Sequence, residues 1–341
     1  MKALAYEKAH ALDAFALDLI EVDEPEVGDR DLVVEIRAIG VNPGEAFIRS
    51  IRSAAPGGRV ILGWEFAGVV TGTGPAATGF AVGDRVMGTG DMTRDGCWAQ
   101  RLAVDHRVVA TIPDQLSFAD AASLPIGSLT AWEAMFGDQP APPPGVDTVL
   151  IVGGAGGVGS MATQLLKART SAFVIGTASR PQSRQWCQAM GADLVIDHTA
   201  DVTQQLSQAG IEQVDMVLST AGTADNLAWI GAVLRPFGHL SAIDLGGPLD
   251  LGPLVQKSVS LHTEMVFSQI IASADPNRQD GILQAVGDHV AASQLRPIVT
   301  TRLQGLTVPS MRTAHELLET RRTVGKVVIE TGPDAARPAH T

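Results

Sequence analysis

The segment Thr148–Ser160, TVLIVGGAGGVGS, constrains the fold more than any other part of the chain. A strand-like apolar run leads into a glycine-rich turn, and the turn opens a helical pattern. Gly154, Gly156 and Gly159 fit G-x-G-x-x-G, in which the glycines permit a tight turn, the approach of a pyrophosphate and close helix–strand packing. The segment predicts a dinucleotide-binding turn formed by Gly154, Ala155, Gly156, Gly157, Val158 and Gly159.

The rest of the chain divides into two patterns. After the glycine turn, the strand-like runs FVIGTA, DLVIDH, DMVLST and HLSAID alternate with helical segments, which is typical of a parallel doubly wound sheet. The first 120 residues or so carry short β-rich runs between turn signals, which predict a mostly antiparallel fold. The tail, with PIVTTRL and GKVVIE, looks like more of this first part. We predict one domain from residues 1–124 and 297–341, and a second from residues 125–296.

Composition favours small-molecule chemistry in the cytoplasm. The formal net charge is −12, which leaves no basic surface for a nucleic acid. No apolar run reaches the roughly 18 residues of a membrane helix, and the N-terminal residues do not form a signal peptide. Cys97 and Cys187 are too few and too far apart for a disulfide framework or a cysteine-rich zinc site.

The residues after the second strand of the doubly wound sheet favour NADP(H). An NAD site would place an acid there, but Phe173–Gln188 contains none. The segment GTASRPQSR instead offers groups suited to a phosphate, with Arg180 as the first candidate for the 2′-phosphate. Alternatively, Arg180 and Arg184 are solvated residues at a helix start, an interpretation that suits Arg184 better. The proposed phosphate contacts are Ser179, Arg180 and Ser183.

Taken together, AIGVNPGEAFIRS, ILGWEFAGVV, GDRVMG, ASLPIGSLTAWEAMF, VGGAGGVGS, MGADLVIDH and GKVVIE resemble the medium-chain dehydrogenases/reductases over nearly the whole chain. The resemblance is narrower to the quinone oxidoreductase branch and its zinc-type alcohol dehydrogenase-like group. It implies an α/β protein with a GroES-like catalytic domain built from both chain ends. It also implies a Rossmann domain between them and a cleft where nicotinamide meets substrate.

The residues at the expected metal positions do not suit zinc. A catalytic zinc needs three protein ligands and an open fourth position. Where the zinc alcohol dehydrogenases have a cysteine and a histidine, this sequence has Asn42 and Trp64. The segment around Asp91–Trp98, which matches their structural zinc lobe, contains only Cys97. We therefore predict a zinc-free protein in which Trp64 fills the vacated volume and Glu65 is a structural acid.

Without a Lewis acid, oxidising a simple alcohol is difficult, because nothing stabilises the alkoxide. Hydride transfer from NADPH to a quinone or an α,β-unsaturated carbonyl avoids this problem, since the charge delocalises onto oxygen. The sequence favours an NADPH-dependent reductase of such compounds. Two alternatives stay open: an alcohol or aldehyde oxidoreductase, and a non-catalytic, redox-responsive NADPH-binding protein.

The resemblance also implies roles for individual residues near the reaction. Asn42 matches a cleft asparagine whose amide could donate to the oxyanion, although it could equally hold the Asn42–Pro43 turn. Thr130 matches a helix-borne threonine beside the cofactor; an ordinary intrahelical hydroxyl bond is the alternative. Phe47 stands where many quinone reductases have tyrosine, so we expect Phe47 and Trp64 to line an apolar substrate pocket.

The remaining positions implied by the resemblance lie in the second half of the chain. Arg322 and Lys326 would reach the cofactor phosphates or the cleft; alternatively, one of them pairs with Glu65. Residues 258–267 match edge strands that pair two Rossmann sheets in relatives, which predicts a homodimer. The residues expected to line the nicotinamide are Ala242, Ile243, Asp244, Val266 and Phe267.

Overall fold

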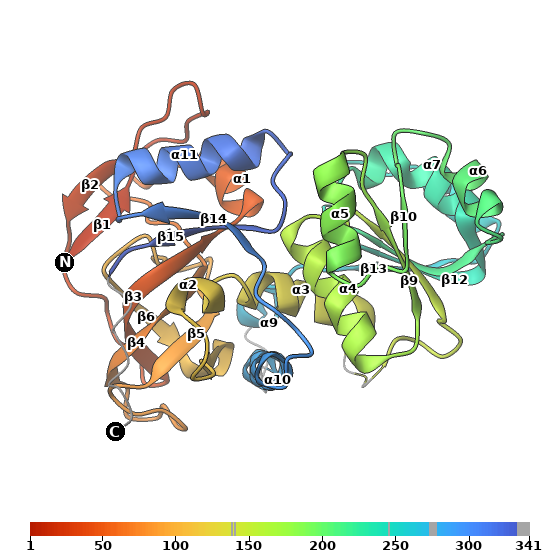
Figure 1. The fold of residues 1–341 in the computed structure, drawn as a ribbon. Helices are drawn as coiled ribbons and strands as arrows, with labels where there is room; N and C mark the ends of the chain where they lie inside the picture. The colour runs from red at the N-terminus through yellow and green to blue at the C-terminus, as the bar shows by residue number, and fades with distance from the viewer. Residues whose placement is uncertain (138, 140, 245, 273–277, 333–341) are drawn as a thin grey trace. The chain divides into compact units, whose positions relative to one another are not determined.

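The computed structural model describes residues 1–137, 139, 141–244, 246–272 and 278–332. The chain divides into two units, drawn together in Figure 1. Unit 1 contains Met1–Ile126 and Phe267–Thr341, and unit 2 contains Gly127–Val266. The chain thus returns to unit 1 at Phe267, well before the predicted Pro297. The reason is that α10 (Gln279–Ala291) packs against β7 (Val109–Thr111), a strand of unit 1.

Unit 1 is built on a seven-stranded sheet with the strand order β14-β15-β3-β4-β5-β7, and β6 also pairs with β3. The strand pairs are antiparallel except β14 with β15, so the predicted mostly antiparallel GroES-like domain is confirmed. A separate antiparallel pair consists of β1 (Lys2–Ala5) and β2 (Asp18–Glu21). The sheet strands are β3 (Asp31–Val41), β4 (Glu65–Thr73), β5 (Arg85–Thr89), β6 (Arg101–Asp105), β7 (Val109–Thr111), β14 (Val299–Gln304) and β15 (Lys326–Glu330).

Strand β3 is the centre of this sheet and carries much of the core of unit 1. Leu32, Val34 and Ile36 are buried, which is the period-2 pattern of a strand with one face packed on apolar side chains. The helical elements of unit 1 are α1 (Pro43–Ile51), the 3-10 turn η1 (His106–Val108), α2 (Phe118–Ala121), α9 (Ser268–Ile271), α10 (Gln279–Ala291) and α11 (Val308–Glu319).

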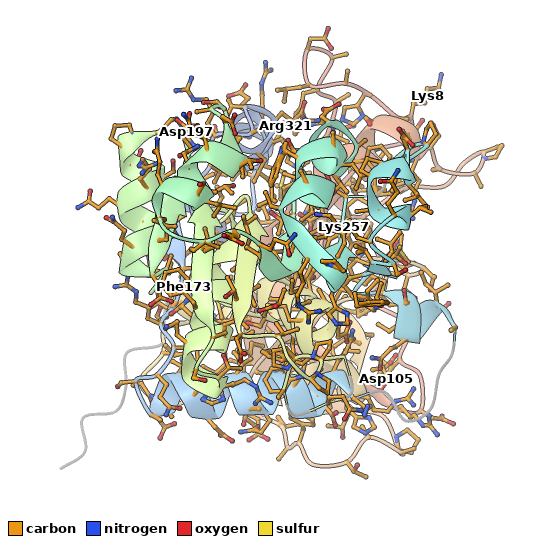
Figure 2. The ribbon with its side chains drawn as sticks, turned by 90° about the vertical axis from the view of Figure 1, so that its right-hand side faces the viewer. Lys8, Asp105, Phe173, Asp197, Lys257 and Arg321 are labelled. Atoms are coloured by element: carbon orange, nitrogen blue, oxygen red, sulfur yellow. The ribbon has the colours of Figure 1, made fainter. Side chains whose placement is uncertain are left out.

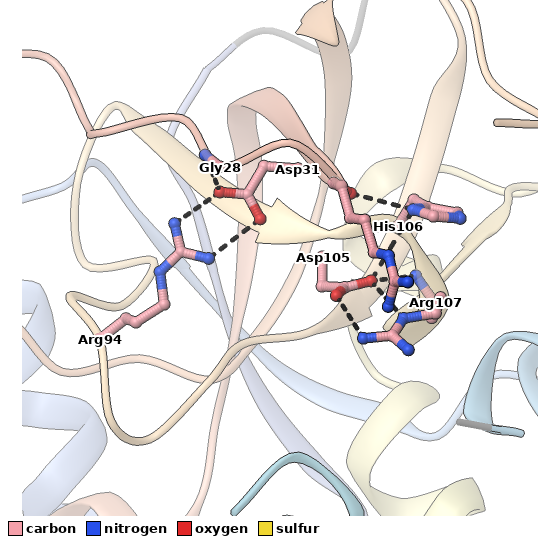
Figure 3. A network of polar contacts seen from close by, with 7 residues as sticks. Gly28, Asp31, Arg94, Asp105, His106 and Arg107 are labelled. Atoms are coloured by element: carbon pink, nitrogen blue, oxygen red, sulfur yellow. Dashed lines mark hydrogen bonds and ion pairs between the residues drawn. The ribbon is translucent and has the colours of Figure 1, made fainter. Parts of the chain in front are cut away.

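The segment expected to match a structural zinc lobe is held by an ion pair. Figure 3 shows Arg94 reaching Asp31 at the start of β3, with nitrogen–oxygen distances of 3.0 and 2.6 Å. The same carboxylate accepts the backbone N–H of Gly28 at 2.7 Å. A bidentate arginine–carboxylate contact fixes both position and orientation. This ion pair therefore holds the loop around Arg94 against the start of β3.

Unit 2 is a six-stranded sheet with the order β10-β9-β8-β11-β12-β13, and all neighbouring strands are parallel. This is the order 3-2-1-4-5-6 of a dinucleotide-binding sheet, so the predicted Rossmann domain is confirmed. Its strands are β8 (Thr148–Val152), β9 (Phe173–Thr177), β10 (Leu194–Ile196), β11 (Val214–Ser219), β12 (Leu234–Ala242) and β13 (Ser260–Thr263).

The helices of unit 2 connect these strands and bury an apolar core that includes Leu150, Ile175 and Leu240. Lys257, labelled in Figure 2, donates to the carbonyl oxygens of Ala232, in α7 (Thr223–Val233), and of Leu234, the residue after this helix. Helix α3 (Pro125–Phe136) begins in unit 1 and continues into unit 2. The other helices are α4 (Gly157–Arg169), α5 (Pro181–Ala189), α6 (Val202–Gln208), α7 (Thr223–Val233) and α8 (Gly252–Val255).

None of the helices within the described residues combines the length and the apolar composition that a membrane crossing requires.

Candidate active site

In unit 1, the candidate site is a buried polar cluster where three neighbouring strands begin or end. Strand β3 lies between β15 and β4, and Val327 pairs with Val41 while Ile39 pairs with Phe66. This register brings Lys326, at the start of β15, and Glu65, at the start of β4, to the end of β3. Asn42 follows directly after β3 and precedes α1.

Glu65 is the centre of the cluster and is completely buried. One carboxylate oxygen accepts the backbone N–H of Ile126 at 2.8 Å. The other accepts the side-chain amide of Asn42 at 3.0 Å and forms an ion pair with Lys326. The prediction that Glu65 is a structural acid agrees with this geometry. Of the two candidates for the ion pair, Lys326 is the partner of Glu65.

The side chain of Asn42 has a partner at each of its polar atoms. Its Oδ1 accepts a hydrogen bond from Lys326 Nζ at 2.5 Å. Its Nδ2 donates to Glu65 at 3.0 Å and to the carbonyl oxygen of Gly40 at 3.3 Å. Exchanging the two amide atoms would direct an N–H at the ammonium and an oxygen at the carboxylate, so the network fixes the amide orientation.

A second buried carboxylate, Glu45, lies on the first turn of α1. It accepts the backbone N–H groups of Asn42 at 2.9 Å and of Trp64 at 3.0 Å. Burial raises the pKa of Glu45 from its usual 4.5 to about 7, and the neighbouring carboxylate of Glu65 adds to the rise. The two backbone donors and the Lys326 ammonium oppose it. The cluster thus contains two carboxyl groups and one ammonium group.

Glu45 should make the stability of unit 1 depend on pH. Its folded-state pKa lies above its unfolded-state value, so the folded chain holds a proton that the unfolded chain releases between about pH 4.5 and 7. Its contribution to the free energy of unfolding falls as the pH rises through that window, by about 3 kcal/mol. Glu45→Gln stays neutral, so its stability relative to the wild type should increase by about 2.5 kcal/mol from pH 5 to pH 8. Urea unfolding at both pH values measures the difference, and a constant difference would contradict the assignment.

The positions expected to match metal ligands do not fit zinc. Asn42 is hydrogen-bonded throughout, and Trp64 offers an indole in place of an imidazole. Burial raises the pKa of Cys97 well above its usual range, and its thiol donates to the backbone oxygen of Glu65 at 3.4 Å. Among the residues that the structure describes, no three His, Cys, Asp or Glu side chains are grouped so that they could hold a metal ion. The side chains at these positions are an amide, an indole and a thiol, whereas zinc sites use imidazole, thiolate and carboxylate. The nearby carboxylates are already engaged: Glu65 by Ile126, Asn42 and Lys326, and Glu45 by two backbone N–H groups.

The residues expected to line the substrate pocket differ in exposure. Trp64 is buried, and its ring packs edge to face on Phe267 with centroids 5.6 Å apart. Its indole N–H has no hydrogen-bond acceptor within the described part of the chain. On α1, Phe47 is 61% exposed and Ile51, one turn later, is 59% exposed. The helix that starts at Asn42 therefore carries an exposed apolar surface.

In unit 2, the glycine turn lies between β8 and α4, as the sequence predicts. The backbone N–H of Gly153 donates to the Thr177 hydroxyl at 3.0 Å, and that of Gly154 donates to the Thr177 carbonyl at 3.2 Å. The first helical hydrogen bond of α4 runs from Ser160 N to Gly156 O. The preceding amides are therefore left at the positive end of the helix, where a phosphate would bind. These residues fit a dinucleotide, and Thr177 is a positioning residue that the sequence patterns did not indicate.

The end of β9 carries the residues expected at a 2′-phosphate. Ser183 is buried, and its hydroxyl accepts the backbone N–H of Arg180 at 3.2 Å and donates to the Arg180 carbonyl at 2.9 Å. Ser183 thus fixes the backbone from which the Arg180 side chain starts. The guanidinium of Arg184 donates to the carbonyl oxygens of Ala178 and Val195, a structural role. Phosphate contacts by Ser179, Arg180 and Ser183 stay predictions.

The remaining predicted positions are spread over both units. Ala242 ends β12, and the Asp244 carboxylate caps α7 through the backbone N–H and hydroxyl of Thr223. Val266 and Thr130 are buried in unit 2, whereas Phe267 is the first residue of the second segment of unit 1. Nicotinamide contacts stay predictions for Ala242, Ile243, Asp244, Val266, Phe267 and Thr130, as does a phosphate contact for the exposed Arg322.

Besides Thr177, two functional residues of unit 1 were missing from the sequence-based prediction, Glu45 and Gly40. Glu45 had a visible signal, since Asn42 followed three residues later by Glu45 is the start pattern of a helix with a capping carboxylate. Gly40 had none. A Cβ built on Gly40 would lie 2.5 Å from the Glu65 carboxylate and 2.3 Å from the carbonyl oxygen of Ala122. The missing side chain leaves the space that Glu65 occupies.

Comparison with known families agrees with both units. Residues 28–114 match the alcohol dehydrogenase GroES-like domain, and residues 190–329 match the zinc-binding dehydrogenases. The second description refers to zinc, which the donor set around Asn42 and Trp64 does not fit.

Whole-length relatives extend this likeness. A zinc-type alcohol dehydrogenase-like protein of Staphylococcus aureus (strain MSSA476) is 33% identical over 338 residues, covering 96% of this chain and 99% of the relative. A structure from Rhizobium etli CFN 42, assigned to the zinc-dependent alcohol dehydrogenases, is 36% identical with a TM-score of 0.93 over 98% of both chains. A quinone oxidoreductase of Pseudomonas syringae pv. Tomato DC3000 is 27% identical with a TM-score of 0.81, over 96% of this chain and 99% of the other.

The observations converge on one family. One family accounts for the antiparallel GroES-like unit, for the Rossmann unit with its glycine turn, and for the relatives that match over the whole length. The chain belongs to the medium-chain dehydrogenase/reductase superfamily, a family of nicotinamide-dependent oxidoreductases.

Proposed function

We propose that this protein is an NADPH-dependent, zinc-independent reductase of quinones or α,β-unsaturated carbonyl compounds. The proposal rests on Asn42 and Trp64, which stand where the resemblance places the metal ligands of zinc alcohol dehydrogenases. Neither is a zinc ligand, so an alkoxide would lack the Lewis acid that alcohol oxidation uses. The likeness to the quinone oxidoreductase of Pseudomonas syringae pv. Tomato DC3000 supports the substrate class.

The reaction needs little from the protein beyond positioning and a charge to stabilise an anion. Bound NADPH supplies a hydride, which reduces the conjugated carbonyl compound while the nicotinamide is oxidised, and a proton from water completes the product. The exposed apolar residues Phe47 and Ile51 on α1 offer a surface for the ring of such a substrate. Unit 2 would bind the cofactor phosphates at the N-terminus of α4.

The preference for NADPH rests on the segment after β9. No carboxylate follows this strand to accept the ribose hydroxyls of NADH, whereas Ser179 and Arg180 suit a phosphate. Arg180→Ala should weaken NADPH binding by about 10- to 100-fold, because a charged hydrogen bond to the 2′-phosphate is lost. NADH binding should change by less than about threefold. Fluorescence titration with both nucleotides measures the loss of affinity for each. Equal losses for NADPH and NADH would show that Arg180 does not bind the 2′-phosphate.

The function is tested by NADPH oxidation with metal-analysed protein against a naphthoquinone, an ortho-quinone, a cyclic enone and an aliphatic aldehyde. Turnover of a quinone or the enone without bound zinc is the expected result. Stoichiometric zinc together with alcohol-dependent reduction of NADP⁺ would favour alcohol oxidation, the chemistry named for the zinc-type relatives. NADPH binding without turnover of any compound would favour a non-catalytic, redox-responsive role.

We also propose that the protein is a homodimer that pairs through β13. This strand is the last in the described order of the unit 2 sheet, and its residues are exposed. Leu261 in the strand and Met265 just after it are exposed apolar side chains, and an exposed apolar strand edge invites pairing with another chain. Light scattering at micromolar concentration tests this, and a monomer there would contradict it.

A further inference from the structure

The Asn42 amide has no donor left for a substrate. Both protons of its Nδ2 are directed at acceptors of the protein, Glu65 at 3.0 Å and the Gly40 carbonyl at 3.3 Å. Donating to an anion would break one of these bonds and expose a buried acceptor, which is unfavourable. The expectation that Asn42 donates directly to the oxyanion therefore lacks structural support. Asn42 instead holds a neighbouring group in place.

That neighbour is the ammonium group of Lys326. An ammonium group carries three N–H donors, and within the described residues Lys326 has two acceptors, Asn42 Oδ1 and the Glu65 carboxylate. The side chain of Lys326 is 6% exposed, so little water reaches the ammonium group. A buried ammonium group with one N–H that is not used by the protein is a fixed charge, and such a charge stabilises a developing anion strongly.

The protein holds this ammonium group in a single position. Its carboxylate partner, Glu65, is fixed in turn by the backbone N–H of Ile126 and by Asn42. The absence of a side chain at Gly40 leaves room for that carboxylate. Donors held in place before the reaction need no reorganisation when charge appears. The three strand ends thus build a rigid support for one cation.

We propose that Lys326 is the catalytic residue that stabilises the substrate oxyanion, and that Asn42 and Glu65 are its positioning residues. This inference rests on the proposed reduction of a conjugated carbonyl. Bound NADPH would supply the hydride: the C–H bond of its dihydronicotinamide would break and a C–H bond to the substrate would form. The nicotinamide would be oxidised, and the π electrons of the substrate would move to its carbonyl oxygen, which becomes negative. The third N–H of Lys326 donates a hydrogen bond to it. Lys326 keeps its proton, and water supplies the one proton that completes the product.

A phenolate tests the oxyanion site independently of turnover, because it carries the same kind of delocalised charge on oxygen. The probe is 4-nitrophenol, whose neutral and ionised forms differ in absorbance, titrated with NADP⁺ present. Wild-type protein should bind 4-nitrophenolate about 10- to 100-fold more tightly than the neutral phenol, the range expected for a hydrogen bond to a charged group.

Variants separate this role from a structural one. Lys326→Met alone would leave Glu65 buried and unpaired and would be strongly destabilised. The double variant Lys326→Met/Glu65→Gln removes both charges, and Lys326→Arg keeps the ion pair but moves the donor. Both should bind NADPH normally yet lose the preference for phenolate and about 100-fold in kcat. Lys8→Met is the control, since Lys8 is an exposed lysine of the same unit (Figure 2).

The outcomes distinguish the two proposals. A folded double variant or Lys326→Arg variant with wild-type phenolate preference and kcat would overturn the role of Lys326. Turnover of quinones or enones by a wild type that shows no phenolate preference would also overturn it, while leaving the proposed function intact. A Lys326-dependent preference for phenolate, without turnover of any conjugated carbonyl, would support the oxyanion site and overturn the proposed function.

Discussion

Replacing Gly40 with alanine should destabilise unit 1 by about 3 kcal/mol, the upper end of the usual effect of overpacking. The new Cβ would lie 2.3 Å from the carbonyl oxygen of Ala122 and 2.5 Å from the Glu65 carboxylate. The Ala122 oxygen belongs to the backbone and cannot rotate away as a flexible side chain can, and Glu65 is held by Ile126, Asn42 and Lys326. We therefore also expect the displaced carboxylate to disturb Lys326 and to lower reductase activity.

The matched control for this prediction is Gly44→Ala. Gly44 lies on α1, four residues along the chain, and a Cβ there would have no neighbour within 4 Å. Alanine in a helix is about 1 kcal/mol more favourable than glycine, so this variant should be at least as stable as the wild type. Urea unfolding of both variants measures the difference. A Gly40→Ala variant as stable as Gly44→Ala would mean that Glu65 and the segment at Ala122 can move apart freely.

The second large effect is expected for Gly159→Ala in unit 2. A Cβ on Gly159 would lie 2.4 Å from the carbonyl oxygen of Gly153 and 2.8 Å from the Cα of Gly154. Both contacts are with backbone, so the turn between β8 and α4 must open. Because the turn aligns the amides that would face the pyrophosphate, NADPH affinity should fall by at least about 100-fold.

Fluorescence titration with NADPH measures this loss. The control is Gly281→Ala on α10, where an added Cβ would meet nothing within 4 Å. It should bind NADPH as the wild type does. If Gly159→Ala also kept its affinity within about threefold, the cofactor would not depend on the close approach of α4 to β8, and the glycine turn would not be its phosphate site.

The two units differ in how much of their function the sequence predicts. In unit 2, the strand-like runs and the glycine pattern are local features, and they predict the parallel sheet and the place of the turn because connections between parallel strands are short and regular. In unit 1, the pattern predicts antiparallel strands, but the functional residues lie far apart along the chain. Asn42 and Lys326, for example, are separated by 284 positions.

The hydrogen-bond and ion-pair partners in the structure changed the roles expected for Asn42 and Lys326. Asn42 is as suitable an amide donor as any in the sequence, yet its donors are taken by Glu65 and Gly40. Lys326 was indistinguishable from Arg322 as a partner of Glu65 until the pairing of β15 with β3 placed it there. A hydrogen bond depends on distance and direction between two groups, and neither property belongs to one residue alone.

Residue patterns alone were enough to predict the doubly wound sheet, the glycine turn and the lack of an acid after β9. The resemblance to the zinc alcohol dehydrogenases added that Asn42 and Trp64 stand at their ligand positions. These are properties of residue type and local order, which periodicity and spacing record directly. The folded chain was needed to show that Glu45 and Glu65 are both buried and that Glu65 pairs with Lys326. It was also needed to show that Gly40 leaves room for Glu65 and that the chain returns to unit 1 at Phe267. Those facts depend on strand register and on packing between distant segments, which a linear pattern does not contain.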